Sequence, residues 1–183
     1  MEFRGFIAAD VEIPDKIREI SNELKNTGGN LKLVEPEKMH LTLKFLGDTH
    51  QNLVDPIENI MKESVENIEP FEIKLKGLGV FPNENYIKVI WVGIEPGKKL
   101  KEIANNLNEK LSNIGFKKEK REYTPHLTIA RVKSGRKKDE IIKVINKYKR
   151  QEFVSQVIDK LELKKSELTS DGPIYSNKRT VEI

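Results

Sequence analysis

The tripeptide His-Leu-Thr occurs twice in the sequence, at His40–Thr42 and at His126–Thr128, and the two copies lie close to half of the 183-residue chain apart. Each copy opens a run in which polar and apolar residues alternate, Met39–Leu46 and His126–Val132. Alternation with a period of two is typical of a β-strand that buries one face. We therefore expect two related strands, each carrying a histidine and a threonine.

The elements around the tripeptides follow a similar order in both halves, which indicates an internal duplication of residues 1–85 and 86–183. Apolar or alternating runs predict strands at Arg4–Glu12, Leu31–Val34, Met39–Leu46, Phe71–Phe81, Tyr86–Ile94, His126–Val132 and Phe153–Leu163, with the strand at Met39 ending before Gly47-Asp48, and a final hairpin over Glu167–Ile183. Helical spacing of apolar residues predicts helices from Pro14 to Gly28, over Leu53–Val65, over Leu100–Leu111 and around Ile141–Ile145.

This order predicts an α+β fold in a single domain, residues 1–183, with two pseudo-symmetric lobes. Their antiparallel sheets would face a central cleft, and the helices would lie outside. The repeat is too long for a solenoid unit, so it implies two lobes rather than a stacked array.

Composition narrows the class of protein. Hydrophobic residues make up 37% and charged residues 34% of the chain, which favours a soluble globular protein. No apolar run reaches the roughly 20 residues of a membrane helix, and the N-terminus lacks the pattern of a secretory signal. We therefore expect a cytoplasmic protein without membrane contact. The absence of cysteine excludes disulfides, thiolate metal sites and cysteine nucleophiles.

Charge is distributed unevenly along the chain. Residues 1–91 carry a net charge of −5, whereas residues 92–183 carry +9. A basic half of this kind could attract a polyanion, although runs of lysine are also common on solvated surfaces. The charge alone does not decide between these two interpretations.

The repeated tripeptide predicts a catalytic cleft. Residues i and i+2 of a strand share a face, so His40 lies beside Thr42 and His126 beside Thr128. A single histidine on a strand is usually structural, but two at matching positions of a repeat indicate function. Imidazoles with a pKa near ~6.5 can act as acid and base at neutral pH, and threonine hydroxyls can donate to phosphate oxygens. This set of groups suits cleavage of a phosphodiester.

A cation would be needed to neutralise the phosphate. Arg131 is the main candidate, although it lies on the opposite face of an ideal strand from His126 and must be near the strand end or reach around. Lys44 and Arg4 are further candidates. A metal site is less favoured, since zinc usually takes three or four protein ligands and the chain has three histidines and no cysteine.

The chain resembles the two-histidine (2H) phosphoesterase superfamily, in particular the RNA 2′,3′-cyclic phosphodiesterases, also called LigT-like or 2′-5′ RNA ligase-like proteins. The likeness covers nearly the whole chain. It is carried by Arg4-x-Phe6-x-Ala8, by His40-Leu41-Thr42-Leu43 with Phe45-Leu46-Gly47, by Tyr123-Thr124-Pro125-His126-Leu127-Thr128-Ile129-Ala130-Arg131, and by Leu163 and Ser166.

The resemblance implies a LigT-like bilobal fold and a metal-independent hydrolase without a cofactor. It also implies that a 2′,3′-cyclic phosphate is opened to a 2′-phosphate, with His40 as proton donor and His126 as proton acceptor. Thr42, Thr128 and Arg131 would bind the phosphate. We further expect Tyr123 and Phe45 to border the cleft and to help place the nucleoside, although their residue types fit packing roles equally well.

The expected partners are RNA or nucleotides with 2′,3′-cyclic phosphate ends, with tRNA halves as one source, and we expect a monomer that functions in RNA processing. Two alternatives stay open. The same histidines would serve reversible 2′-5′ ligation of RNA, although water at ~55 M favours hydrolysis unless the second RNA is held in place. A protein that binds RNA ends with little turnover would instead show salt-dependent affinity alone.

Overall fold

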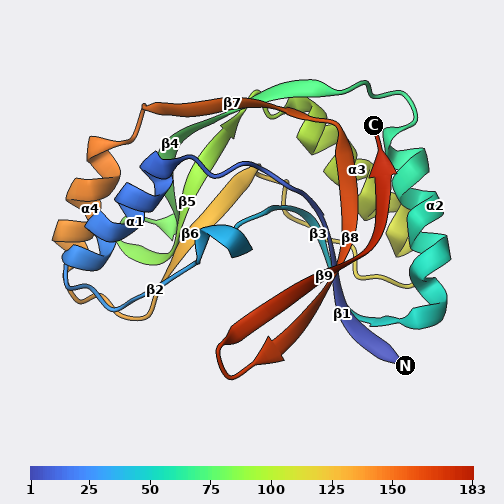
Figure 1. Ribbon diagram of the computed structural model, residues 1–183, viewed down its shortest axis with the longest axis horizontal. Helices are drawn as coiled ribbons and strands as arrows, with labels where there is room; N and C mark the ends of the chain where they lie inside the picture. The colour runs from blue at the N-terminus through green and yellow to red at the C-terminus, as the bar shows by residue number, and fades with distance from the viewer.

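The computed structural model describes residues 1–183 and contains nine strands and four α-helices (Figure 1). The strands are β1 (Glu2–Ala9), β2 (Leu31–Leu33), β3 (Leu41–His50), β4 (Phe71–Asn83), β5 (Tyr86–Glu95), β6 (His126–Val132), β7 (Glu152–Ile158), β8 (Lys160–Thr169) and β9 (Gly172–Glu182). The helices are α1 (Asp15–Asn26), α2 (Val54–Val65), α3 (Lys98–Ser112) and α4 (Lys138–Lys147), with 3₁₀ turns at Pro36–Lys38 and Gln51–Leu53.

The strands form two antiparallel sheets. The four-stranded sheet has the order β3-β1-β8-β9, and the five-stranded sheet has the order β2-β6-β5-β4-β7. The helices α2 and α3 pack beside the first sheet, whereas α1 and α4 pack beside the second (Figure 1). The α+β class expected from the sequence is confirmed. None of the four helices is both long and apolar enough to span a bilayer.

The helix periodicity read from the sequence is reproduced in the structure. In α1, Ile17, Ile20 and Leu24 recur at helical spacing and are fully buried. Pro14 precedes the first turn, where its missing amide costs no hydrogen bond. Gly28 follows the helix with a φ of +72°, a left-handed conformation that glycine adopts without a steric penalty.

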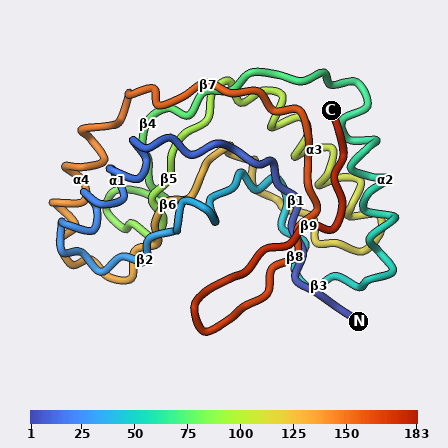
Figure 2. Tube along the Cα trace, in the orientation of Figure 1, coloured from blue at the N-terminus to red at the C-terminus, as the bar shows by residue number.

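Each lobe consists of one sheet with its two helices, and each sheet contains strands from both halves of the sequence. In one sheet β1 lies between β3 and β8, and in the other β5 lies between β6 and β4. Each sheet therefore joins a His-Leu-Thr strand, the first strand of the same half, and a strand from the other half. Figure 2 shows the chain crossing from α2 to β4 and, through β7, from α4 to β8. The boundary between residues 85 and 86 falls inside the β4–β5 hairpin, so the halves of the sequence are not the lobes of the structure.

Two strand predictions were wrong. The segment Phe153–Leu163 is not one strand, because the chain changes sheets at Asp159, between β7 and β8. An apolar pattern continues through such a crossing, so it does not reveal the change of partner. The strand at Met39 also does not end at Gly47, because Gly47 adopts a φ of +70° and still pairs with Gly5 of β1.

Candidate active site

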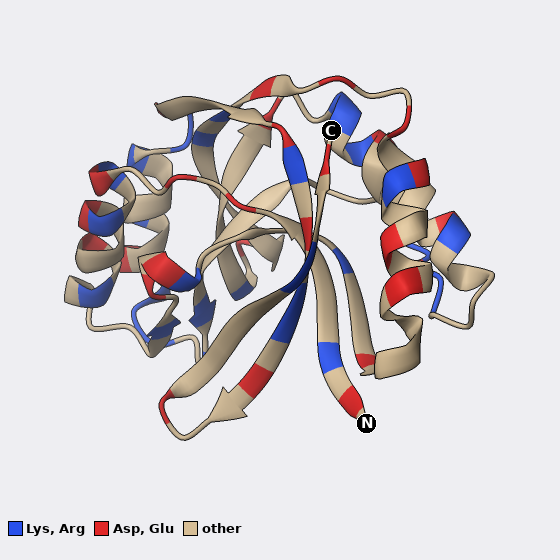
Figure 3. Ribbon diagram, turned by 45° about the vertical axis from the view of Figure 1, so that its right-hand side comes forward, with Lys and Arg blue, Asp and Glu red and all other residues tan.

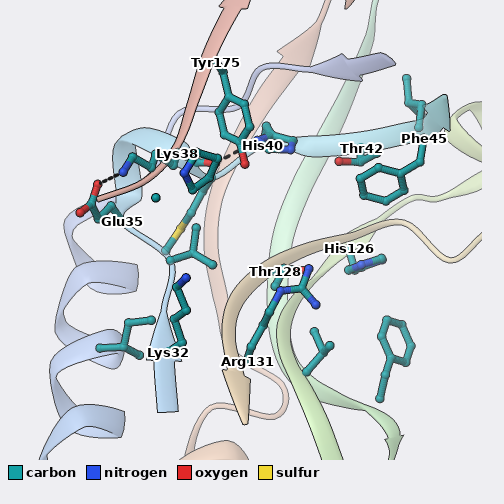
Figure 4. Close-up of a pocket in the computed structure, with 18 of the residues that line it drawn as sticks. Lys32, Glu35, Lys38, His40, Thr42, Phe45, His126, Thr128, Arg131 and Tyr175 are labelled. Carbon is teal, nitrogen blue, oxygen red and sulfur yellow. Dashed lines mark hydrogen bonds and ion pairs between the residues drawn. The ribbon is translucent and has the colours of Figure 1, made fainter. Parts of the chain in front are cut away.

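A cleft of about 550 Å³ lies where the His40 and His126 segments approach each other. Figure 4 shows the two segments on opposite sides of the cleft, with His40 and Thr42 on one side and His126 and Thr128 on the other. All four side chains line it and are half-buried. The structure therefore brings both tripeptides into one site.

The two imidazoles are held in the same way. Nδ1 of His40 lies 2.9 Å from the carbonyl oxygen of Lys38, and Nδ1 of His126 lies 2.7 Å from the carbonyl oxygen of Thr124. A carbonyl has no proton to give, so Nδ1 must be the donor in each case. This fixes the tautomer and leaves both Nε2 atoms for the cleft.

Aromatic rings surround each imidazole. Phe6 stacks on His40 with ring centroids 4.6 Å apart, and the edge of Tyr175 approaches the same ring at 5.0 Å. On the other side Phe81 meets His126 in a T-shaped contact at 5.0 Å, and Trp91 lies 6.4 Å away. These contacts restrict rotation of both imidazoles and remove water from one side of each ring.

Burial is the main electrostatic influence on both histidines. It lowers the pKa of His40, opposed by the hydrogen bond to Lys38 and modified by the charges of Lys164 and Asp10. Burial also lowers the pKa of His126, opposed by the hydrogen bond to Thr124, and the positive charge of Arg131 lowers it further. Both imidazoles are therefore predominantly neutral at pH 7 when the cleft holds no anion.

A β-bulge in β6 determines the direction of the Arg131 side chain. In the β5–β6 pairing Trp91 lies opposite Thr128 and Ile90 opposite Ala130, so Ile129 is an extra residue in β6. The bulge reverses the alternation after Thr128 and turns Arg131 to the face that carries His126. Arg131 lines the cleft, and Figure 4 shows its guanidinium beside Thr128. Of the two expected arrangements, the structure shows the first: Arg131 is the penultimate residue of β6, and the bulge lets it enter the cleft without reaching around the strand.

The same irregularity corrects the expected faces of β3. Ala8 lies opposite Thr42 and Ile7 opposite Lys44, so Leu43 is the extra residue. In an ideal strand Phe45 would lie on the face opposite His40 and Thr42, but here it is 67% exposed and lines the cleft. In an ideal strand Lys44 would lie on the same face as His40 and Thr42, but here it is only 4% exposed.

The two alternative cations are less available to a phosphate. Lys44 also lines the cleft, but its side chain is buried. Nζ of Lys44 donates to Oδ1 of Asn108 at 2.8 Å and to the carbonyl of Lys117 at 2.7 Å, so two of its three donors join β3 to α3 and to the segment after it. Arg4 pairs in register with Asp48 and Ser166 and does not line the cleft. Arg131 is therefore the better placed of the three.

Tyr123 lines the cleft and links the two lobes. Its hydroxyl donates to the backbone carbonyl of Thr42 at 2.9 Å. Burial raises the pKa of the phenol, so the hydroxyl stays protonated and remains a donor. The bond connects the segment before His126 to the segment after His40 and thereby limits the separation of the two tripeptides.

Sequence reasoning missed the contribution of the C-terminal hairpin. The tip of β8–β9 places Asp171, Gly172 and Pro173 at the cleft, and Tyr175 packs on His40. Lys38, whose Nζ pairs with Glu35 at 2.7 Å, lines the same part of the cleft. A hairpin was expected here, but no local pattern in it indicates which distant residue it would contact.

No three His, Asp or Glu side chains are grouped closely enough to form a metal site. His50, the third histidine, is exposed at the end of β3 and does not line the cleft.

The fold and the cleft together define a phosphoesterase of the two-histidine class. The model of the 2′-5′ RNA ligase superfamily matches residues 13–167, and the chain belongs to this superfamily. The RNA 2′,3′-cyclic phosphodiesterase of Methanocaldococcus jannaschii is 44% identical, over 94% of this chain and 96% of that protein. The protein of the same name from Methanothermobacter thermautotrophicus is 38% identical, over 97% of each chain.

Solved structures share the architecture. The crystal structure of E. coli LigT complexed with 3′-AMP superposes with a TM-score of 0.74 at 20% identity, over 100% of this chain and 99% of that one. The crystal structure of TT0787 of Thermus thermophilus superposes with a TM-score of 0.73 at 24% identity, over 98% and 97% of the two chains. The resemblance to the two-histidine superfamily and the LigT-like fold are confirmed.

Proposed function

We propose that this protein hydrolyses 2′,3′-cyclic phosphate ends of RNA or nucleotides to 2′-phosphates. The observation that carries the proposal is the matched pair of imidazoles, each held at Nδ1 by a backbone carbonyl, in one cleft. The relatives named RNA 2′,3′-cyclic phosphodiesterase, at 44% and 38% identity over nearly the full chain, support the same reaction.

In the proposed reaction one imidazole acts as base and the other as acid. Nε2 of His126 takes a proton from water as the water oxygen forms a bond to phosphorus. The bond between phosphorus and the 3′ oxygen breaks, and Nε2 of His40 delivers a proton to that oxygen. The products are a 2′-phosphate and a free 3′-hydroxyl. His40 must be protonated at the start, and the anionic cyclic phosphate favours this by raising the pKa of a nearby imidazole.

Thr42, Thr128 and Arg131 would bind the phosphate during this step. Two hydroxyls and a guanidinium can donate to the non-bridging oxygens, where negative charge increases in the transition state. Phe45 would offer an exposed aromatic surface to the nucleoside, whereas Tyr123 would position the tripeptides relative to each other. The acid–base pair supplies both proton transfers, so the proposal requires no metal ion.

The decisive experiment follows the reaction by phosphorus NMR. The purified protein is incubated in EDTA with a short RNA that ends in a 2′,3′-cyclic phosphate. His40→Ala and His126→Ala are each expected to lose about 10²- to 10⁴-fold in kcat, the usual contribution of general acid–base catalysis. His50→Ala is the matched control, because this third histidine lies outside the cleft.

A 2′-phosphate formed by the wild type and by His50→Ala, and lost in both cleft variants, would support the proposal. Unchanged turnover in either cleft variant would contradict the acid–base roles. Binding of the RNA without turnover by the wild type would favour a protein that binds RNA ends. Four expectations remain predictions from the sequence. These are the cytoplasmic location, the monomeric state, the repeat of residues 1–85 and 86–183, and the use of tRNA halves as a substrate.

A further inference from the structure

A second hollow of about 260 Å³ adjoins the cleft, and we call it the outer pocket. Arg131 and Lys133 line both, so the two spaces are neighbours at the end of β6. The other walls of the outer pocket come from the β4–β5 turn, from the loop after β6 and from the first turns of α4: Asn85–Lys88, Ser134, Gly135, Lys138 and Ile141.

The outer pocket is lined by four basic side chains and by no acidic one. These are Lys88, Arg131, Lys133 and Lys138. None of the four takes part in an ion pair, although fifteen other basic side chains of the protein do. Figure 3 shows acidic and basic residues interleaved on the outer helices, whereas the lining of the pocket carries basic residues alone.

The nearby carboxylates do not neutralise this group. Glu84, in the β4–β5 turn, pairs with Lys149 at 3.8 Å, and Glu140, on α4, pairs with Lys143 at 3.0 Å. Asp139 is next to Lys138 in sequence but does not line the pocket. Four cations without a facing anion produce a positive potential that attracts a chain of phosphates.

An aromatic surface lies beside the cations. Tyr86 is 62% exposed, and Nζ of Lys88 lies 5.2 Å from the centre of its ring. A large exposed aromatic side chain at the edge of a basic groove is the arrangement on which nucleic-acid bases stack. The outer pocket thus combines contacts for a phosphate with a surface for a base.

We propose that the outer pocket binds the phosphodiester and the nucleoside immediately 5′ to the nucleotide that carries the cyclic phosphate. This rests on the proposed function, since the cyclic phosphate at the histidines leaves the 5′ phosphate as the only continuation of the strand. From Arg131 that continuation meets Lys133 and Lys88 next. The protein therefore acts on RNA ends in preference to cyclic mononucleotides.

The test compares two substrates that differ by one nucleotide: adenosine 2′,3′-cyclic phosphate and the ApA dinucleotide that ends in a 2′,3′-cyclic phosphate. The wild type is expected to favour the dinucleotide by about tenfold in kcat/KM, the size of one stacking contact with one phosphate contact. That preference is expected to decrease as salt increases, because phosphate contacts are screened.

The double variant Lys88→Gln/Lys138→Gln is expected to remove most of the preference for the dinucleotide and to leave the rate on the mononucleotide unchanged. The single variant Tyr86→Ala is expected to have the same effect. Lys143→Gln is the control, since it removes one positive charge from α4, the helix of Lys138, at a position that does not line the outer pocket. Equal rates of the wild type on the two substrates, or a preference that survives the Lys88/Lys138 variant, would overturn the inference. Failure of the wild type to hydrolyse either substrate would instead refute the proposed function and, with it, the inference.

Discussion

Phe45 and Arg131 occupy equivalent positions in the two lobes. Each lies three residues after the threonine of its tripeptide, and each follows a β-bulge at the residue directly after that threonine. The bulges turn both side chains into the cleft. The backbone is thus alike at these two positions while the chemistry is not, since one lobe contributes an aromatic ring and the other a guanidinium.

This asymmetry predicts different kinetic effects at the two positions. Arg131→Met is expected to lower kcat by about 10²- to 10³-fold, because a donor to the developing charge is lost. Phe45→Ala is expected to raise KM with a smaller effect on kcat, because it removes only a surface for the nucleoside. Steady-state kinetics on one cyclic substrate measures both. An unchanged kcat in Arg131→Met would contradict a role for Arg131 at the phosphate.

The lowered pKa values of His40 and His126 predict the pH dependence of kcat/KM. The base must be neutral, so activity requires a pH above its pKa, and the acid must be protonated, so activity requires a pH below its pKa. Both pKa values lie below the usual ~6.5 in the free enzyme, so we expect a bell-shaped profile with its maximum below pH 6.5. The profile of kcat should lie at higher pH, because the bound phosphate anion raises the pKa of the imidazoles. A maximum of kcat/KM well above pH 7 would exclude this assignment.

The same shifts predict how stability varies with pH. Below about pH 6.5 the unfolded chain binds more protons than the folded one. The contribution of the two histidines is therefore fully present above that pH, and the free energy of unfolding decreases as the pH falls from 6.5 through the lowered folded pKa values. Urea denaturation at several pH values measures this. The decrease should be smaller in the double variant His40→Ala/His126→Ala.

The Tyr123 side chain has two parts that can be tested separately: the hydroxyl, which donates to the carbonyl of Thr42, and the aromatic ring. Tyr123→Phe is expected to cost about 1 kcal/mol of stability, the net value of a typical hydrogen bond. It should also lower kcat, because the link between the tripeptides is lost while the ring remains. Tyr123→Ala removes the ring as well, so a raised KM in this variant alone would assign nucleoside contact to the ring. Unchanged activity and KM in a folded Tyr123→Ala protein would exclude Tyr123 from the site.

Gly79 leaves the space for the Trp91 ring, which is one of the two aromatic rings that contact His126. It lies opposite Trp91 in the β4–β5 pairing, and a Cβ atom at this position would overlap the Trp91 ring. Gly79→Ala is expected to destabilise the fold by about 1–3 kcal/mol through overpacking. It should also lower kcat, because Trp91 packs on Phe81 and both contact His126.

Trp91 is the only tryptophan, so its fluorescence reports the displacement directly. Gly135→Ala is the matched control, because a Cβ atom there meets nothing within 4 Å. A native emission spectrum and native stability in Gly79→Ala would mean that the ring moves without cost.

The sequence by itself determined the local elements and the candidate reacting groups. Apolar spacing such as Ile17, Ile20 and Leu24 specifies a helix with one buried side, since that periodicity depends on near neighbours alone. The alternation after His40 and His126 specifies strands in the same way, and the duplicated tripeptide identified both imidazoles. The class of fold followed from the order of these elements.

Only the tertiary structure decided the features that depend on distant partners. The bulges at Leu43 and Ile129 exist only in register with β1 and β5, so no local pattern placed Phe45 and Arg131 in the cleft. The division of Phe153–Leu163 between two sheets and the arrival of Tyr175 at His40 likewise depend on strand pairing across the whole chain. Side-chain periodicity encodes which residues are buried, whereas pairing over long separations decides what they are buried against.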